Sequence, residues 1–260
     1  MNIKDTKIIF FDIDGTLLKL GTKELSPKMK ETLLKLKSNH IKICIATGRA
    51  LLTIPKFEGI DFDAIIAFNG SYCCTKKNVI YKNPIPAKTV HQIIKNASSI
   101  DRPVALASLD MLGANGSDQD LEDYFKIAHE PVPTEVDFDY LSKQDIYQIM
   151  SGGRKEEYSS LLREVDGAEI TAWWDRAVDI IPLSGSKALG IQKTLEHFNL
   201  TKEQAIAFGD GNNDIPMLKS VGIGIAMGNA GAEVKKMADV VCDSVENDGI
   251  YKYCKKYHLL

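Results

Sequence analysis

The stretch Phe10–Leu18, FFDIDGTLL, places two aspartates one residue apart at the end of an apolar run. The run itself, Ile8–Phe11, has no polar residue, and such runs are typical of strands buried on both faces of a parallel sheet. A buried carboxylate is costly unless it is paired or coordinates an ion. Asp12 and Asp14 therefore require partners at the end of this strand, and other parts of the chain must supply them or help to hold an ion.

Four further apolar runs have the same character and predict more buried strands, namely Ile41–Ala46, Ala64–Phe68, Ala205–Phe208 and Ile223–Ala226. Between the strands at 8–11 and 41–46, the segment 26–38 begins with Ser26 and Pro27, which favour the N-cap and the first turn of a helix. Its apolar residues recur at helical spacing. Strand, helix and strand in this order predict an α/β fold with a doubly wound, Rossmann-like parallel sheet.

The middle of the chain has a different pattern, with shorter alternating elements and turn signals. Proline and glycine punctuate residues 83–86 and 181–186, so we expect hinges at both places. This predicts an inserted α+β domain at residues 84–182 and a discontinuous core made of residues 1–83 and 183–260.

Composition limits the classes of function. The chain has 260 residues, a formal net charge of −3 and 44% hydrophobic residues, which is ordinary for a globular protein. This charge argues against nucleic acid as a partner, and no segment is long and apolar enough to span a bilayer. Five cysteines form no CxxC pair, and the start of the sequence lacks a signal-peptide pattern. We therefore expect a cytoplasmic protein without nucleic-acid or membrane partners, whose oligomeric state the sequence does not indicate.

Four polar segments lie where the predicted strands end or where a helix begins. They contain Asp12 and Asp14, Thr47 and Gly48, Lys187, and Asp210, Asn213 and Asp214. Because the carboxyl ends of parallel strands share one edge of a sheet, we expect these side chains to meet there. Carboxylates are the ligands that Mg²⁺ prefers, while a hydroxyl and an ammonium group suit phosphate oxygens. The combination predicts a site for a divalent cation and a phosphate group.

Two other interpretations of these motifs fit less well. An EF-hand loop needs glycine at position 6 and glutamate at position 12, and neither acidic segment has them. The glycines at 222, 224 and 228 have the spacing GxGxxxG rather than the GxGxxG of dinucleotide-binding loops. A DxDGT segment by itself is equally consistent with a capped turn, but four acids with a threonine and a lysine favour a functional site.

DIDGT, TGR, a lysine that opens a helix, and GDGNND occur in this order, and together they resemble the haloacid dehalogenase superfamily of phosphohydrolases. NGS at 69–71, the large insert after it and IAMGNA at 225–230 resemble the Cof-like, type IIB branch of that superfamily. The resemblance covers both segments of the predicted core. Over the insert, which would then be a cap domain, it is one of position and size only.

The resemblance implies that Asp12 is the nucleophile, which attacks phosphorus and forms an aspartyl-phosphate intermediate. It implies that Asp14 is the general acid for the leaving group and then the base for water. A carboxylate nucleophile divides a difficult displacement into two steps, which agrees with this assignment.

The resemblance also implies how phosphate and metal are held. Thr47, Gly48 and Lys187 would bind the phosphoryl group, and Asn213 would either touch the phosphate or orient Lys187. The Mg²⁺ would be held by Asp12, by Asp14 through its backbone carbonyl, by Asp210 and, in support, by Asp214. The cation and the lysine would offset the repulsion between carboxylate and phosphate.

These inferences predict a phosphatase that requires Mg²⁺ and hydrolyses small phosphorylated metabolites, with sugar phosphates the first guess. Two alternatives stay open: a phosphotransferase or phosphomutase on the same core, and a catalytically idle protein that binds a metabolite. The insert would act as a lid that selects the leaving group. Within it, Trp174 and Arg176 are candidates to line the substrate pocket, although paired tryptophans are more often part of a core.

Overall fold

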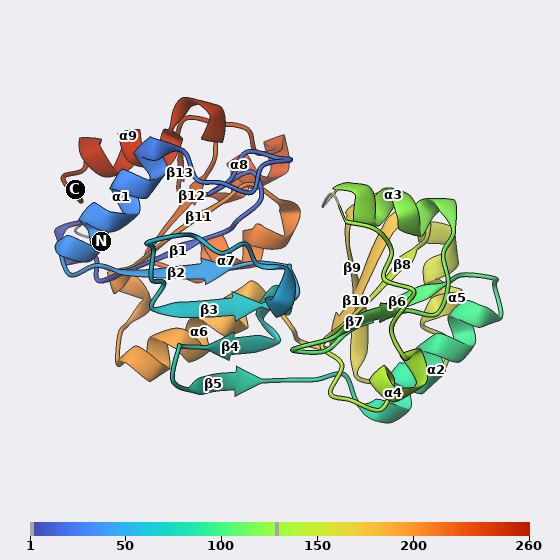
Figure 1. Ribbon diagram of the computed structural model, residues 1–260. Coiled ribbons are helices and arrows are strands. Elements are labelled where there is room, and N and C mark those ends of the chain that lie inside the picture. Colours follow the sequence, from blue (N-terminus) through green and yellow to red (C-terminus); the bar gives the residue numbers. More distant parts are fainter. Residues whose placement is uncertain (1–2, 128–129) are drawn as a thin grey trace. The chain divides into compact units, whose positions relative to one another are not determined.

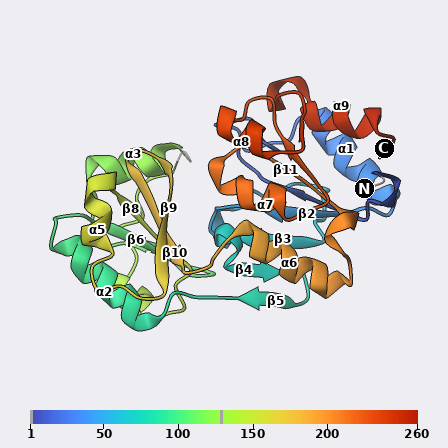
Figure 2. The same cartoon turned by 180° about the vertical axis from the view of Figure 1, so that it is seen from behind.

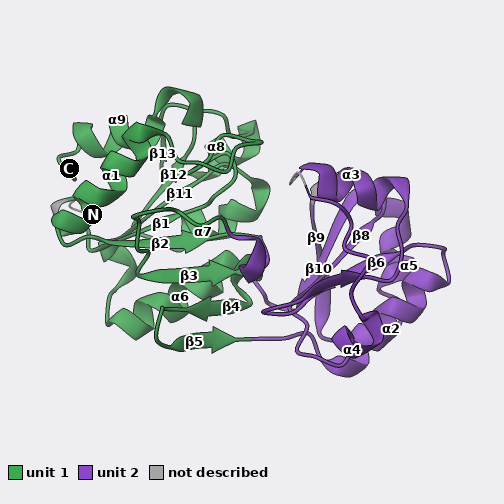
Figure 3. Cartoon of the chain, viewed as in Figure 1, with its two compact units in different colours: residues 1–48, 55–82, 186–260 green, residues 49–54, 83–185 purple. Residues whose placement is uncertain are grey.

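The computed structural model describes residues 3–127 and 130–260. Figure 3 shows that the chain divides into two compact units. Unit 1 consists of Met1–Gly48, Pro55–Lys82 and Ser186–Leu260, and unit 2 consists of Arg49–Ile54 and Asn83–Gly185. The short segment Arg49–Ile54 thus groups with the middle of the chain, which the sequence pattern does not indicate.

Unit 1 is built on one eight-stranded sheet, with the strand order β13-β12-β11-β1-β2-β3-β4-β5 (Figure 1). The strands are β1 (Ile8–Phe11), β2 (Lys42–Ala46), β3 (Ala64–Ala67), β4 (Tyr72–Cys74), β5 (Val79–Lys82), β11 (Ala205–Gly209), β12 (Ile223–Ala226) and β13 (Val240–Val241). All neighbours from β13 to β3 pair in parallel, whereas β4 and β5 add an antiparallel edge. The prediction of an α/β fold with a parallel core sheet is confirmed.

Helices cover both faces of this sheet, as Figures 1 and 2 show from opposite sides. They are α1 (Pro27–Ser38), α6 (Lys187–Phe198), α7 (Ile215–Lys219), α8 (Ala232–Met237) and α9 (Gly249–Lys256). One apolar cluster joins alternate residues of β1 and β2 to α6, α7 and α8, while α1 packs beside α9. Ser26 caps α1 by accepting a hydrogen bond from the N–H of Met29 at 3.1 Å, which confirms the predicted helix start.

Unit 2 is an antiparallel sheet with helices, and its strand order is β7-β6-β8-β10-β9. The strands are β6 (Val104–Ala107), β7 (Leu112–Ala114), β8 (Gln148–Gly152), β9 (Ala168–Trp174) and β10 (Ala177–Pro182); the helices are α2 (Ala87–Ser98), α3 (Gln119–Ile127), α4 (Phe138–Leu141) and α5 (Tyr158–Leu161). An apolar cluster joins one face of the sheet to α2, α4 and α5, so this unit has its own core. No helix among the described residues is long and apolar enough to cross a membrane.

Candidate active site

The order of the parallel strands brings three of the predicted segments to one edge of the sheet. β1 lies between β2 and β11, and Phe11 is in register with Ile45 of β2 and Phe208 of β11. Asp12 directly follows β1, Thr47 directly follows β2 and Asp210 directly follows β11. These residues are far apart in sequence, and they meet because all three strands point the same way and end at the same level.

Lys187 joins the remaining segments to this edge. Its Nζ lies 2.6 Å from Oδ1 of Asp12 and 2.6 Å from Oδ1 of Asp214, and its side chain is fully buried. Lys187 is the first residue of α6, and Ser186 caps that helix by accepting a hydrogen bond from the N–H of Leu189. The helix start therefore directs the long side chain into the sheet edge, where two carboxylates share its charge.

Asp210 is held by two side chains to which the sequence motifs gave no role. Its Oδ1 accepts a hydrogen bond from Oγ1 of Thr16 at 2.8 Å, and its Oδ2 lies 3.3 Å from Nδ2 of Asn229. The same amide nitrogen donates to the carbonyl of Gly15 at 2.8 Å, which ties the DIDGT turn to Asp210. Gly15 has φ +79°, and a Cβ there would lie 2.2 Å from Oδ2 of Asp210, so only glycine fits. Thr16 belongs to the DIDGT motif and Asn229 to the IAMGNA motif, so these two motifs could have identified both residues from the sequence.

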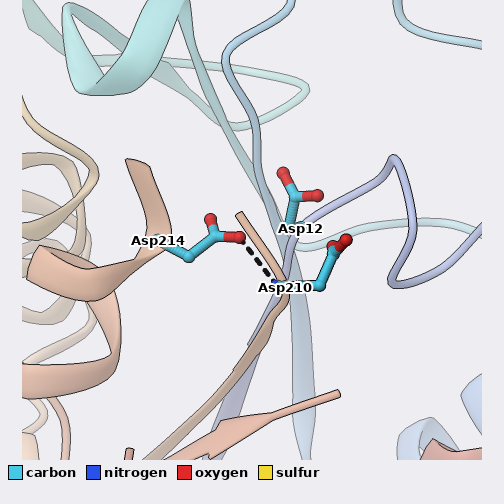
Figure 4. Close-up of side chains that lie close together, drawn as sticks. All are labelled: Asp12, Asp210 and Asp214. Carbon is cyan, nitrogen blue, oxygen red and sulfur yellow. Dashed lines mark hydrogen bonds between the residues drawn. The ribbon is translucent and has the colours of Figure 1, made fainter. Parts of the chain in front are cut away.

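Asp214 is oriented by the backbone of its own loop. Its Oδ2 accepts hydrogen bonds from the N–H groups of Asp210 and Gly211, both at 2.9 Å. Figure 4 shows the carboxyl group of Asp214 directed at the backbone nitrogen of Asp210, while the carboxyl groups of Asp12 and Asp210 lie side by side. Lys187 donates to Oδ1 of Asp214, so both oxygens of Asp214 accept hydrogen bonds that orient its carboxyl group within the cluster.

The three carboxylates form a donor set that fits a small divalent cation. One oxygen from each of Asp12, Asp210 and Asp214 lies within 4.8 Å of the others. They are hard oxygen donors, the type that Mg²⁺ selects, and the ammonium group of Lys187 can balance only part of their charge. The turn that holds Asp12 also carries Asp14, whose half-buried carboxyl group is not one of these three.

Burial and charge shift the pKa values of these groups. Burial raises the pKa of Asp12 well above its usual range; Lys187 lowers it, and Asp214, Asp210 and Asp14 raise it further. Burial, with the charge of Asp214, raises the pKa of Asp210 to about 6, although the hydrogen bond from Thr16 acts the other way. Burial lowers the pKa of Lys187, but the two adjacent carboxylates outweigh it and the net pKa is raised. Lys187 is therefore charged at neutral pH, and a bound cation would relieve the repulsion among the carboxylates that contributes to the raised pKa values of Asp12 and Asp210.

The predicted phosphate-binding residues lie together beside this cluster. Thr47 is buried, and its N–H donates to the carbonyl of Ile66 in β3. Nδ2 of Asn213 donates to Oδ1 of Asn69 at 3.0 Å, and a Cβ on Gly48 would lie 3.0 Å from the same oxygen. Gly48 and Asn213, which come from different loops, thus meet at the amide of Asn69.

The structure gives less support to Trp174 and Arg176, the two residues of the insert that are candidates to line the substrate pocket. Arg176 lies 3.4 Å from a carboxylate oxygen of Asp123 and 3.9 Å from one of Asp120, so its charge is paired within unit 2. The side chain of Trp174 lies outside the part of the chain that the structure describes. The proposal that these two residues line a pocket gains no support from these contacts.

Comparison with known proteins decides the family. The sequence model of the haloacid dehalogenase-like hydrolases matches residues 9–254, which is nearly the whole chain. The chain belongs to this family. The predicted superfamily and the phosphatase class are confirmed, and so is the likeness to the type IIB branch.

Three similar proteins show how far this likeness extends. YkrA of Bacillus subtilis (strain 168) is 33% identical over 98% of this chain and 99% of its own length. The structure of BT1666 from Bacteroides thetaiotaomicron, a phosphatase of the superfamily, matches with a TM-score of 0.90 and 33% identity, over 98% of this chain and 96% of that one. The type IIB sugar phosphatase BT4131 matches with a TM-score of 0.86 and 31% identity, over 98% and 100%. Both units of this haloacid dehalogenase-like hydrolase therefore have counterparts in known phosphatases.

Proposed function

We propose that this haloacid dehalogenase-like hydrolase is an Mg²⁺-dependent phosphatase of small phosphorylated metabolites, which acts through an aspartyl-phosphate intermediate. The observation that carries the proposal is the contact of Lys187 with Asp12 and Asp214 next to Asp210. A carboxylate and a phosphate dianion repel one another, and positive charge at the point of attack is the main requirement for their reaction.

The proposed reaction has two steps. In the first, a carboxylate oxygen of Asp12 bonds to phosphorus, the phosphorus–oxygen bond of the ester breaks, and the carboxyl group of Asp14 gives its proton to the leaving oxygen. In the second, water attacks the phosphorus of the aspartyl phosphate and gives a proton to Asp14. Inorganic phosphate leaves, and Asp12 returns to its carboxylate form.

Other residues would hold the phosphoryl group while this happens. Lys187 fixes the orientation of the Asp12 carboxylate and offsets part of the charge. We assign binding of the phosphoryl oxygens to Thr47, Gly48 and Asn213, together with Lys187. Asp12, Asp210 and the carbonyl of Asp14 would hold the Mg²⁺, with Asp214 in support. When bound, the ion supplies positive charge that offsets the charge of the phosphoryl oxygens.

Recognition of the leaving group is assigned to unit 2. We propose that residues 84–182 form the cap domain and select the ester. Sugar phosphates are the first substrate class to test, because BT4131, a sugar phosphatase, is 31% identical over nearly the whole chain.

The five cysteines form no disulfide, which supports a reducing compartment such as the cytoplasm.

The decisive experiment is a screen of the purified protein against phosphorylated metabolites with Mg²⁺, with release of inorganic phosphate as the readout. We expect release that stops in EDTA and in the Asp12→Asn variant. Isomerised substrate without phosphate release would instead identify a phosphomutase, and transfer to an added alcohol would identify a phosphotransferase. Binding of a metabolite without any turnover would instead identify a catalytically idle protein that binds a metabolite.

A further inference from the structure

The turn after β3 has a strained backbone. Phe68, Asn69 and Gly70 all have positive φ, at 51°, 52° and 96°. The left-handed region is unfavourable for a bulky side chain such as that of Phe68, and such strain persists only where surrounding contacts maintain it. All three residues are buried, and the turn lies at the same edge of the sheet as the carboxylate cluster because β3 runs parallel to β2.

Asn69 connects two of the loops assigned to phosphate. Its N–H donates to the carbonyl of Thr47 at 3.1 Å, which ties it to the loop after β2. Its Oδ1 accepts a hydrogen bond from Nδ2 of Asn213 at 3.0 Å, which ties it to the loop after β11. Gly48 packs against the same amide, since a Cβ on Gly48 would lie 3.0 Å from Oδ1 and 3.2 Å from Nδ2 of Asn69.

Gly70 connects the turn to the start of α6. A Cβ on Gly70 would lie 2.0 Å from the carbonyl oxygen of Ser186 and 3.1 Å from the backbone nitrogen of Lys187. Farther along α6, a Cβ on Gly190 would lie 3.2 Å from Cα of Gly70. The helix that carries Lys187 therefore sits directly against the backbone of the turn, and no side chain fits between them.

We propose that Asn69 is a positioning residue for the phosphoryl group, which acts by holding the amide of Asn213. The inference deepens the proposed function and rests on it. An amide nitrogen carries two hydrogens, and Asn69 accepts one of those on Asn213, which leaves the second for a phosphoryl oxygen. The left-handed turn is what presents Oδ1 of Asn69 to both the Thr47–Gly48 loop and Asn213. Without this acceptor, the side chain of Asn213 loses its fixed orientation and binds phosphate less well.

The test is a double-mutant cycle of Asn69→Gly and Asn213→Ala. Glycine accepts positive φ, so Asn69→Gly keeps the turn and removes only the amide. A matched control is Asn199→Gly, because Asn199 has φ 55° at the end of α6 in the same unit and lies in no assigned site. KM and kcat for p-nitrophenyl phosphate, and the competitive inhibition constant of inorganic phosphate, are measured with saturating Mg²⁺. Circular dichroism and thermal unfolding show that each variant is folded.

We expect Asn69→Gly to raise KM and the inhibition constant of phosphate roughly three- to tenfold, the effect of one neutral hydrogen bond, with a smaller change in kcat. If Asn69 acts through Asn213, the double variant is no worse than Asn213→Ala alone. Unchanged constants in folded Asn69→Gly, or effects of the two changes that simply multiply, would overturn the inference. Equal effects in Asn199→Gly would also overturn it, since they would reflect the backbone alone.

A second readout separates this inference from the proposed function. If the wild-type protein releases no phosphate from any ester, the proposed function fails, yet calorimetric binding of inorganic phosphate with Mg²⁺ can still be compared among the same variants. Weaker phosphate binding in Asn69→Gly, with no further loss in the double variant, supports the positioning role. Phosphate affinity equal to that of the wild type contradicts it.

Discussion

Nζ of Lys187 and Oδ1 of Asp12 lie 2.6 Å apart, although 175 positions separate these residues in the chain. Neither group is well solvated, because the lysine side chain is fully buried and only 10% of the aspartate side chain is exposed. A buried ion pair of this kind is stable only while both partners are present. Asp12 belongs to the first segment of the discontinuous core and Lys187 to the last. The site can therefore form only when these two segments fold together.

Lys187→Met tests this contact most directly, because methionine keeps the unbranched apolar stem of the lysine side chain and removes the charged end. With Asp12 and Asp214 left unpaired, we expect the free energy of unfolding without metal to fall by about 3–5 kcal/mol at pH 7. We also expect kcat/KM to fall by about a hundredfold or more, since charge at the point of attack is lost. Denaturant unfolding and phosphate release provide the two measurements.

The control for this variant lies on the same helix. Lys193 is partly exposed and pairs with Glu196 on the surface of α6, so Lys193→Met should change stability by no more than about 0.5 kcal/mol and leave activity intact. If Lys187→Met and Lys193→Met behave alike, the buried contact has neither a structural nor a catalytic role.

Asp12→Asn should eliminate turnover and leave the fold intact. The amide has nearly the shape of the carboxylate but is not a nucleophile, so we expect residual activity below about 1% of wild type. Stability should change by less than about 1 kcal/mol, because a weaker contact with Lys187 is offset by less repulsion from Asp210 and Asp214. Phosphate release and thermal unfolding measure the two effects. Substantial activity in the folded variant would assign the nucleophile to another residue.

Asp14→Asn should have an effect that depends on the leaving group. An alkoxide leaving group needs a proton and a phenolate needs it much less, so the first step should slow more for a sugar phosphate than for an aryl phosphate. Rapid-mixing measurement of aspartyl-phosphate formation isolates this step from hydrolysis. Equal losses on both esters would remove Asp14 from the role of general acid.

The raised pKa values predict how Mg²⁺ stabilises the protein at different pH. The pKa of Asp210 rises from 3.8 to about 6 on folding, and that of Asp12 rises as well. Between these values the folded protein binds more protons than the unfolded one, so these groups make the metal-free protein less stable as pH rises from about 4 through 6. A cation requires the deprotonated form, and its stabilising effect should therefore grow over the same range.

Thermal unfolding with and without Mg²⁺ at pH 5.0 and pH 7.5, at constant ionic strength, checks this prediction. The increase in Tm on adding Mg²⁺ should be clearly larger at pH 7.5. An increase of equal size at both pH values would mean that Asp12 and Asp210 do not have to lose protons when the ion binds, and that they are not its ligands.

The local sequence was sufficient to predict five strands of unit 1, namely β1, β2, β3, β11 and β12, and the position of the polar segments, but not the edge strands β4, β5 and β13 or the individual strands of unit 2. Ile8–Phe11 and the similar apolar runs indicate buried parallel strands, and Asp12, Thr47 and Asp210 each follow such a run. Since parallel strands all end at one edge, strand direction alone brings these residues to the same side of the sheet. The hydrophobic pattern of a strand is a property of neighbouring residues, and it can therefore be read without knowing the rest of the fold.

The specific contacts were decided only by the tertiary structure. No local pattern of the sequence indicates that Lys187 bonds both Asp12 and Asp214. Nor does one indicate that Thr16 and Asn229 hold Asp210, or that Asn69 joins Gly48 to Asn213. Each depends on the strand order and on the placement of side chains from loops that are distant in sequence. Many orders of the same strands satisfy the same hydrophobic pattern, and the close packing of the side chains selects the one in which these atoms come within hydrogen-bonding distance.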